Sequence, residues 1–332
     1  MISINHVMSN DVSSGIFNDF LGYFKKIGLT QGFRHIDSIR PLDGVLIRHY
    51  HRPNLEANLI NPCVVTVHHD LSETDEWLVF SNYEKQYRQA DALVCLCYQQ
   101  KKFLEGRGFT NVIVIPHGYN AKFLSRPPSI RKLVGTRKVT LGIISRRYPR
   151  KVKGEALFHE LLKRLAPDTV RFLLIGQDRG EDHVYLDRLG FEYESYDSVP
   201  YPVLCNAYHE MDALLVLSSH EGGPANVPEA LVTHTPILST KIGMCLDYVT
   251  HGQNGMFLTG NPDKDAEVIG SFCSNKNNLA DALMAGAANP RRLPWTWEEV
   301  VREYSRVYHE IIAVLMSGGS GSGWHTEGRA DA

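Results

Sequence analysis

The sequence predicts an α/β protein made of two successive units, each with a parallel sheet covered by helices. Three observations lead to this prediction. Short apolar runs alternate with helical stretches, which is the pattern of parallel strands covered on both faces. The alternation stops near residues 126–138, where paired prolines and charges indicate a linker, and then begins again. The length of 332 residues suits two domains better than one.

In the first unit, brief apolar stretches rich in β-branched residues predict buried strands. The expected strands are residues 2–8, 44–50, 62–70, 92–98 and 111–118. More polar stretches predict helices at residues 13–28, 82–90 and 99–108. The first of these helices closes on a glycine, which is a common helix stop.

The second unit repeats this alternation. Its expected strands are residues 139–145, 170–176, 213–219, 235–240 and 255–258. Its expected helices are residues 154–166, 200–211 and 226–234, and a last strong helix follows at 296–316. Residues 317–332 are rich in Gly and Ser, so we expect a flexible tail, either an added segment or a native disordered end.

The bulk composition excludes several classes of protein. The 35 Lys and Arg nearly balance the 37 Asp and Glu, which argues against a protein built to coat nucleic acid. No apolar run approaches the roughly 20 residues that span a bilayer, and the N-terminus lacks the features of a signal peptide. The six cysteines are scattered through expected strands without a CxxC pair. This favours buried, reduced thiols in a cytosolic protein over disulfides or a metal site.

The stretch from residue 218 to residue 240 holds two glutamates around a glycine-rich turn. Glu221 precedes Gly222 and Gly223, and Glu229 follows in an expected helix that has Pro228 near its start. Ligands of doubly wound sheets bind at the carboxyl ends of strands, and a carboxylate can accept two hydrogen bonds from a vicinal diol. The same spacing would also arise from a solvated loop glutamate and a first-turn glutamate. The strand, turn and helix around the pair favour a ligand site that binds phosphate, sugar and ribose.

A second cluster follows the first strand of the second unit. Residues 146–153 hold five cations, and Gly154 comes directly after them. Such runs are usually solvated loops. Five cations within eight residues of a chain with a net charge of −2 instead favour an anion site, in which Arg and Lys neutralise a diphosphate.

A third candidate lies at the end of the expected strand 62–70. His68 could position a sugar hydroxyl or move a proton, although 15 histidines make a chance occurrence easy. His68 and His69 are adjacent on a strand and point to opposite faces, which disfavours metal binding by the pair. The sequence has no GxGxxG, GxxxxGK[ST] or GxSxG motif, so dinucleotide redox enzymes, P-loop ATPases and α/β-hydrolases lose their main support.

Five ordered elements together resemble the retaining, GT-B-fold glycosyltransferases of family 4, also called group 1 glycosyltransferases. The stretch HEGGPANVPEAL is similar to the E-x7-E motif of that family, and SRRYPRKVKG is similar to its Arg…Lys-Gly element. VIVIPHGYN, KIGMCLDYVTHGQNGMFL and WTWEEVVREYSRVY resemble the domain-linking element, the segment after E-x7-E and the terminal helix. The resemblance covers residues 1–315.

The resemblance implies two Rossmann-like domains that face each other across a cleft. The expected N-terminal acceptor domain is residues 1–128, and the helix 297–315 crosses back onto it. The expected nucleotide-sugar donor domain is residues 138–296. The tail 317–332 belongs to neither domain.

The resemblance also implies roles for individual residues. Arg147 and Lys153 would hold the donor diphosphate and stabilise the leaving group, Glu221 would contact the donor sugar, and Glu229 would contact the ribose. His68 would lie beside the reacting centre. The catalytic candidates are therefore His68, Glu221, Arg147 and Lys153.

Further donor-binding residues come from two loops. Gly15, near the start of the first helix, would bring a backbone N–H to the diphosphate, although SSG replaces the more common double-glycine loop. Backbone contacts to sugar and phosphate would come from Gly222, Gly223, Pro224, Ala225 and Asn226. No metal and no cofactor is expected, because the nucleotide sugar is itself a substrate.

Other functions remain open on the same fold: a sugar-nucleotide epimerase, a phosphorylase and a catalytically silent binding module. A sugar-nucleotide epimerase would alter the donor without an acceptor, and a catalytically silent module would only bind it. The expected partners are a nucleotide-sugar donor and a glycan or glycolipid acceptor, with no nucleic acid. The expected location is cytoplasmic, and peripheral contact with the inner face of a membrane is left open.

Overall fold

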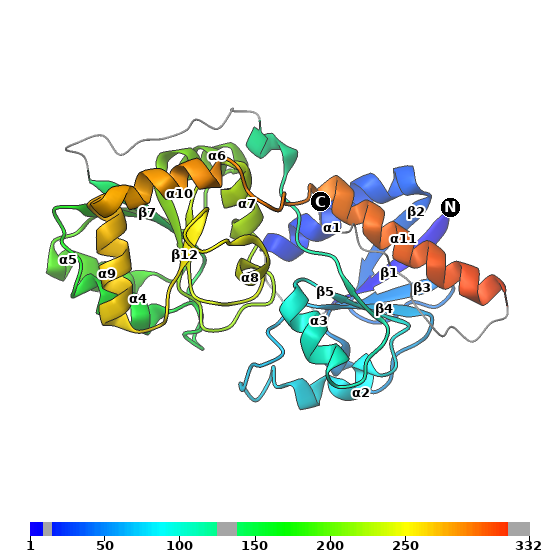
Figure 1. The fold of residues 1–332 in the computed structure, drawn as a ribbon. Coiled ribbons are helices and arrows are strands. Elements are labelled where there is room, and N and C mark those ends of the chain that lie inside the picture. Colours follow the sequence, from blue (N-terminus) through cyan, green and yellow to red (C-terminus); the bar gives the residue numbers. More distant parts are fainter. Residues whose placement is uncertain (9–14, 125–137, 318–332) are drawn as a thin grey trace. The chain divides into compact units, whose positions relative to one another are not determined.

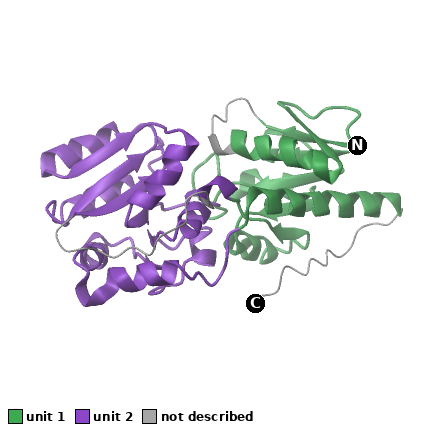
Figure 2. Ribbon diagram, turned by 90° about the horizontal axis from the view of Figure 1, so that it is seen from above, with its two compact units in different colours: residues 1–118, 295–332 green, residues 119–294 purple. Residues whose placement is uncertain are grey.

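The computed structural model describes residues 1–8, 15–124 and 138–317, and these form two compact units. Figures 1 and 2 show unit 1, which is Met1–Gly118 with Trp295–Ala332, and unit 2, which is Tyr119–Pro294. The first segment of unit 1 ends at Gly118, whereas the expected first domain extends to residue 128. The expected linker and tail lie mainly outside the described residues.

The sheet of unit 1 is wholly parallel in the order β2-β1-β3-β4-β5-β6. Its strands are β1 (Ile2–Val7), β2 (Phe33–Ser38), β3 (Ile47–Tyr50), β4 (Cys63–Val67), β5 (Ala92–Cys95) and β6 (Val112–Val114). Its helices before residue 118 are α1 (Gly15–Ile27), α2 (Glu84–Tyr87) and α3 (Tyr98–Glu105), with short 3-10 turns at Gly28–Gln31, Pro53–Leu55 and Phe80–Asn82. Every residue of β3, β4 and β5 is buried, as expected for strands covered on both faces.

Unit 2 repeats this architecture with the sheet order β12-β11-β10-β7-β8-β9, again parallel throughout. The strands are β7 (Val139–Ile144), β8 (Val170–Ile175), β9 (Glu192–Tyr196), β10 (Ala213–Val216), β11 (Ile237–Ser239) and β12 (Gly255–Phe257). The helices are α4 (Glu155–Leu162), α5 (Gly180–Leu189), α6 (Tyr201–Glu210), α7 (Asn226–Val232), α8 (Cys245–Tyr248), α9 (Pro262–Cys273) and α10 (Leu279–Ala287). Two 3-10 turns, Ala121–Leu124 and Lys276–Asn278, complete the unit. The predicted α/β class is confirmed in both halves.

The terminal helix α11 (Trp297–Met316) packs within unit 1, although the residues that lead into it, up to Pro294, belong to unit 2 (Figure 1). Thr296 begins it with a capping box, in which the Thr296 side chain accepts from the Glu299 N–H and Glu299 accepts from the Thr296 N–H. Its buried face repeats at helical spacing through Trp297, Val301, Tyr304 and Tyr308. These side chains join Phe20, Phe24 and Ile4 in one hydrophobic core.

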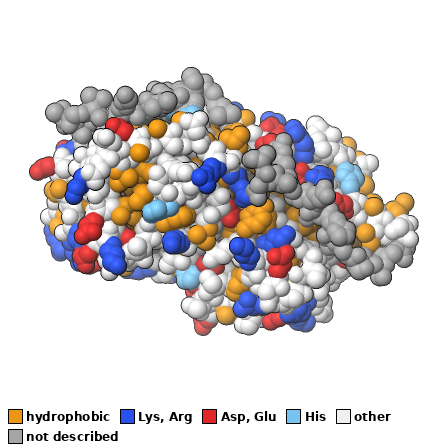
Figure 3. Space-filling model, in the orientation of Figure 1, with side chains coloured by type: hydrophobic (Ala, Val, Ile, Leu, Met, Phe, Trp, Pro, Cys, Tyr) orange, Lys and Arg blue, Asp and Glu red, His pale blue; other side chains and the backbone are white. Residues whose placement is uncertain are grey.

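Several bulk expectations can be compared with the structure. All six cysteines lie within the described ranges, where they are buried and none forms a disulfide. Within the described ranges, no helix is long and apolar enough to cross a membrane. Figure 3 shows basic and acidic side chains together on the visible face, in keeping with the near balance of charge.

Candidate active site

The loop after β10 holds Glu221 in contact with Lys153. The Lys153 ammonium donates to Glu221 Oε1, and the Ser218 hydroxyl donates to the same oxygen at 3.0 Å. The side chains of Lys153 and Glu221 are only 17% and 13% exposed. Partial burial weakens the screening of this ion pair by water. The basic cluster and the first glutamate of the E-x7-E motif therefore meet at the carboxyl edge of the second sheet.

Gly154 explains why Lys153 reaches this position. Its φ is +78°, and an added Cβ would lie 2.2 Å from the carbonyl oxygen of Leu217 at the end of β10. Only glycine combines this backbone conformation with so close an approach. The Ser219 N–H also donates to the Val152 carbonyl at 2.9 Å. The two loops are thus joined through their backbones.

Arg147 is buried and engaged with the protein itself. Its guanidinium donates to both carboxylate oxygens of Asp182, at 2.8 and 3.1 Å, and to the Lys153 carbonyl at 3.0 Å. Asp182 also accepts from Arg179 at 2.8 Å and pairs with His159 at 2.8 Å. Burial alone would raise the pKa of Asp182, but the hydrogen bonds from His159 and Arg147 outweigh it and lower the pKa to about 2. In this structure Arg147 braces the backbone that carries Lys153.

The second glutamate is held by two tyrosines of α6. The Tyr208 hydroxyl donates to Glu229 Oε2 at 2.7 Å, and the Tyr201 hydroxyl lies 3.5 Å from Oε1. Tyr208 is fully buried, and burial followed by the charge of Glu229 raises its pKa well above the usual value. Glu229 is itself only partly buried. The tyrosines therefore fix the direction of its carboxylate.

The segment between the glutamates is held against the sheet. Asn226 Nδ2 donates to the Ile144 carbonyl at the end of β7, at 2.8 Å, while its buried Oδ1 has no hydrogen-bond partner among the described residues. A Cβ on Gly243 would lie 2.6 Å from the Glu221 carbonyl and 2.7 Å from the Gly222 carbonyl. The intervening Gly223 and Pro224 lead to Ala225, the N-cap of α7.

The other two candidates belong to unit 1. His68 follows β4, and its Nε2 lies 2.9 Å from His51 Nδ1. Burial, followed by the neighbouring His51, lowers the pKa of His68 well below the usual value. Gly15 is the first residue of α1. The structure thus brings Lys153 together with Glu221, whereas His68 and Gly15 belong to the other unit.

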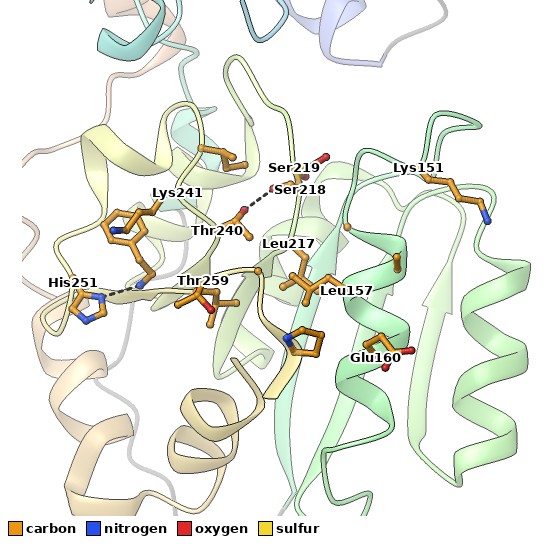
Figure 4. Close-up of a pocket in the computed structure, with 17 residues that line it drawn as sticks. Lys151, Leu157, Glu160, Leu217, Ser218, Ser219, Thr240, Lys241, His251 and Thr259 are labelled. Atoms are coloured by element: carbon orange, nitrogen blue, oxygen red, sulfur yellow. Dashed lines mark hydrogen bonds between the residues drawn. The ribbon is translucent and has the colours of Figure 1, made fainter. Parts of the chain in front are cut away.

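A cavity of about 1110 Å³ adjoins the loop after β10 in unit 2. Figure 4 shows its lining between α4 and the ends of β10, β11 and β12. Its polar wall includes Lys151, Ser218, Thr240, Lys241 and His251, and Thr240 Oγ1 donates to the Ser218 carbonyl at 2.6 Å. Ser218 borders both this cavity and Glu221. Neither Lys153 nor the two glutamates line it. The cavity is therefore a neighbour of the candidate site and not the site itself.

Part of unit 2 matches a known protein family. Residues 138–275 match the family model described as glycosyl transferases group 1. Residues 138–275 form a group 1 glycosyltransferase domain. No curated protein sequence matches the chain.

Solved structures show the same fold over nearly the whole chain. A sucrose-phosphate synthase from Thermosynechococcus elongatus superimposes with a TM-score of 0.74 at 13% identity, covering 95% of this chain and 100% of its own. Anabaena HepE in complex with UDP and glucose gives 0.66 at 15% identity, covering 93% and 100%. A glycosyltransferase from Rickettsia africae gives 0.65 at 15% identity, covering 94% and 98%. The chain therefore has the GT-B fold. The family match and the fold together support a glycosyltransferase.

Several residues that contact the candidate site in unit 2 were not predicted from the sequence. Tyr201 and Tyr208 are separated by seven positions, or two helical turns, and this spacing could have indicated a shared face. Asp182, by contrast, lies 35 positions after Arg147. No pattern in the sequence indicates that these two residues are in contact. Ser218 could have been noticed as a hydroxyl beside Glu221.

One histidine cluster of unit 1 has the composition of a metal site. Among the described residues, His6, His49 and His51 have ligand atoms within 4.8 Å of one another. His6 Nδ1 lies 2.9 Å from His51 Nε2, and both nitrogens of His49 are hydrogen-bonded, to Tyr308 and Thr66 at 2.7 Å each. These nitrogens already serve as partners in side-chain hydrogen bonds, so the arrangement does not fit a metal centre.

Proposed function

We propose that the chain is a retaining hexosyltransferase, which moves a sugar from a nucleoside-diphosphate sugar to a hydroxyl group of a glycan, glycolipid or small molecule. The observation that carries the proposal is the contact between Lys153 and Glu221 on a group 1 glycosyltransferase domain. It joins a cation suited to a diphosphate and a carboxylate suited to sugar hydroxyls. Glu229 lies on the helix that follows the same loop.

The donor class is supported by the ligands of a similar structure. HepE was solved with UDP and glucose, and also with UDP-glucose. The shared fold makes a nucleoside-diphosphate sugar the first ligand to test on this chain. A glycan or glycolipid acceptor, and a cytoplasmic setting in the synthesis of surface polysaccharide or glycoconjugates, complete the proposal.

Lys153 and Glu221 would separate when the donor binds. In the structure their charges compensate each other. A diphosphate competes for Lys153, and Glu221 then accepts hydrogen bonds from hydroxyls of the donor sugar. The exchange places positive charge where negative charge develops on the leaving group, which is the most effective form of electrostatic catalysis. Arg147 would assist by fixing the Lys153 backbone, and its direct contact with the diphosphate would require the Asp182 pair to open.

Glu229 would bind the ribose. Two tyrosines hold its carboxylate, so less conformational entropy is lost when a diol binds. The backbone from Gly222 to Asn226 would lie along the sugar and phosphates between the two glutamates. In unit 1, Gly15 would bring a backbone N–H to the diphosphate and His68 would act beside the reacting carbon.

The reaction would proceed on one face of the sugar. The bond between the anomeric carbon and the diphosphate oxygen breaks, and the acceptor oxygen bonds to the same face. The acceptor proton passes to an oxygen of the leaving diphosphate. This step needs no carboxylate nucleophile, and Lys153 supplies the charge that a metal would otherwise provide. We therefore propose metal-independent catalysis.

The experiment is a thermal-shift series with UDP-, GDP-, ADP- and dTDP-sugars on the wild type, Lys153→Ala and Lys151→Ala. Lys151 is a matched control because it lies in the same loop, is 61% exposed and pairs with Glu181. We expect one nucleotide class to stabilise the wild type and Lys151→Ala but not Lys153→Ala. Equal stabilisation of both variants would contradict the site, and no response to any donor would contradict the proposed function.

A further inference from the structure

Four histidines of unit 1 form a continuous hydrogen-bonded chain that ends at His68. His35 Nδ1 lies 2.8 Å from His6 Nε2, His6 Nδ1 lies 2.9 Å from His51 Nε2, and His51 Nδ1 lies 2.9 Å from His68 Nε2. Each Nδ1 thus faces the Nε2 of the next ring. Three of the four residues are buried, and His68 at the end is partly exposed.

The register of the parallel sheet creates this chain. The four residues lie on or directly after β2, β1, β3 and β4, which are neighbours in that order. His35 pairs with Ile4, two positions before His6, and His6 pairs with His49, two positions before His51. Since side chains two positions apart share a face, each ring lies diagonally from the last. The chain therefore runs toward the carboxyl edge of the sheet.

All four rings are neutral near pH 7. Burial lowers the pKa of His35 to about 4 and that of His51 to about 3. Burial, followed by neighbouring histidines, also lowers the pKa of His6 and that of His68 well below the ordinary value. A neutral imidazole has one N–H donor and one bare nitrogen acceptor. The three hydrogen bonds must consequently all point in the same direction along the chain.

The buried end at His35 decides that direction. His35 Nε2 is buried and has no hydrogen-bond partner among the described residues. The Gly28 backbone packs against this edge of the ring, where a Cβ would lie 2.3 Å from Nε2. If the chain ran from His68 to His35, Nε2 would carry a buried N–H without an acceptor. The opposite direction leaves only a bare lone pair there, which is the less costly defect.

We infer that the histidine chain fixes His68 in the tautomer with its proton on Nδ1, so that His68 acts toward a ligand as a neutral hydrogen-bond donor and not as a general base. His35, His6 and His51 each donate from Nδ1 to the next Nε2. His68 Nε2 accepts from His51, and any hydrogen bond from His68 Nδ1 is a donated one. His51 is thus a positioning residue for His68. The catalytic meaning of this state rests on the proposed function, because a sugar oxygen is the acceptor that a neutral N–H would contact there.

The tautomer can be measured without donor or acceptor. Long-range ¹H–¹⁵N spectra of the full chain labelled at histidine distinguish a protonated nitrogen from a bare one, and the His68→Gln spectrum identifies the His68 signals. We expect His68 Nδ1 to be protonated and Nε2 to be bare in the wild type. A protonated His68 Nε2 in the wild type would overturn the inference. This result does not depend on whether any variant folds.

Two matched variants then test the role of the chain. His51→Leu removes the donor to His68, so the His68 spectrum should lose its pure Nδ1–H state. His35→Leu makes the same change two links away; His6 Nε2 then becomes the buried end without a partner, so by the same argument the direction of the chain and the His68 state should persist. An unchanged His68 tautomer in a folded His51→Leu variant would contradict the positioning role.

The transferase reaction provides a separate measurement. We expect His51→Leu to lower turnover on the order of tenfold, as is usual for partners that orient a functional histidine. Stabilisation by the donor should persist, because Lys153 and Glu221 lie in unit 2. If no sugar nucleotide stabilises the wild type, the proposed function is overturned, whereas the tautomer assignment is unaffected.

Discussion

Replacing Gly154 with alanine tests how the loop that carries Lys153 is built. Gly154 has a φ of +78°, and an added Cβ would lie 2.2 Å from the Leu217 carbonyl oxygen and 2.6 Å from the Leu217 carbonyl carbon. Both neighbours are backbone atoms and cannot turn aside as a flexible side chain would. The substitution therefore adds a conformational cost and a packing cost.

Gly190 separates these two costs. It caps α5 with a φ of +75°, and a Cβ there would meet nothing within 4 Å. A non-glycine residue in this left-handed region costs about 1–2 kcal/mol, from which a gain of about 0.4–1 kcal/mol in the unfolded chain is subtracted. We expect Gly190→Ala to lower the free energy of unfolding by about 1 kcal/mol. Gly154→Ala adds a packing cost of about 1–3 kcal/mol, for a total of about 2–4 kcal/mol.

The assay is urea unfolding followed by far-ultraviolet circular dichroism. Fluorescence is unsuitable because the four tryptophans, at positions 77, 295, 297 and 324, all lie outside unit 2. Equal losses of stability in the two variants would refute the close packing of Gly154 on β10. The thermal response of Gly154→Ala to sugar nucleotides should also weaken, since Lys153 shifts with its neighbour.

Four further predictions follow from other contacts in the structure. Arg147→Ala should destabilise the chain by about 1.5–3 kcal/mol in urea titrations, because it removes two charged hydrogen bonds to the buried Asp182, which keeps Arg179; a loss below about 1 kcal/mol would contradict the brace. Since the pKa of Asp182 is lowered to about 2, it contributes stability above its unfolded pKa of about 4, and that stability should fall as the pH drops from about 4 to 2 in the wild type but not in Asp182→Asn. Tyr208→Phe should cost about 1 kcal/mol of stability and weaken nucleotide binding in calorimetry by releasing Glu229; unchanged affinity would count against the ribose role. Thr296→Ala should cost about 1 kcal/mol through loss of the capping box, measured by thermal unfolding, with no change at all being the contrary result.

The interior strands of both sheets and the edge strands β6 and β12 could be predicted from the sequence, whereas the edge strands β2 and β9 could not. β4, β5, β7 and β10 are almost continuous apolar runs and were expected. The strands β2 and β9 were missed because they read as FRHIDS and EYESY, which contain no apolar run, and every residue of β9 is at least partly exposed. A strand at a sheet edge can be this polar because one of its sides faces no neighbouring strand, whereas the edge strand β6 (VIV) keeps an apolar run and was expected.

The candidate site was predictable where the chemistry is local. Lys153-Gly154 and Glu221 could be noticed as two motifs because strand ends in parallel sheets meet at one edge. Their direct contact depends on the left-handed Gly154 and its packing on Leu217, which only the fold reveals. The engagement of Arg147 by Asp182 and the chain of histidines across four strands depend on strand order and register, which no spacing in the sequence gives.

The most direct test of the central claim is transfer of labelled sugar, from the nucleotide sugar that stabilises the wild type, to a panel of glycosides and glycolipids. Wild type is compared with Glu221→Ala and with Glu210→Ala, an exposed glutamate at the end of α6 in the same unit. We predict transfer by the wild type and by Glu210→Ala, and a loss of about a hundred- to a thousand-fold in Glu221→Ala. Full transfer by a folded Glu221→Ala variant would contradict the account.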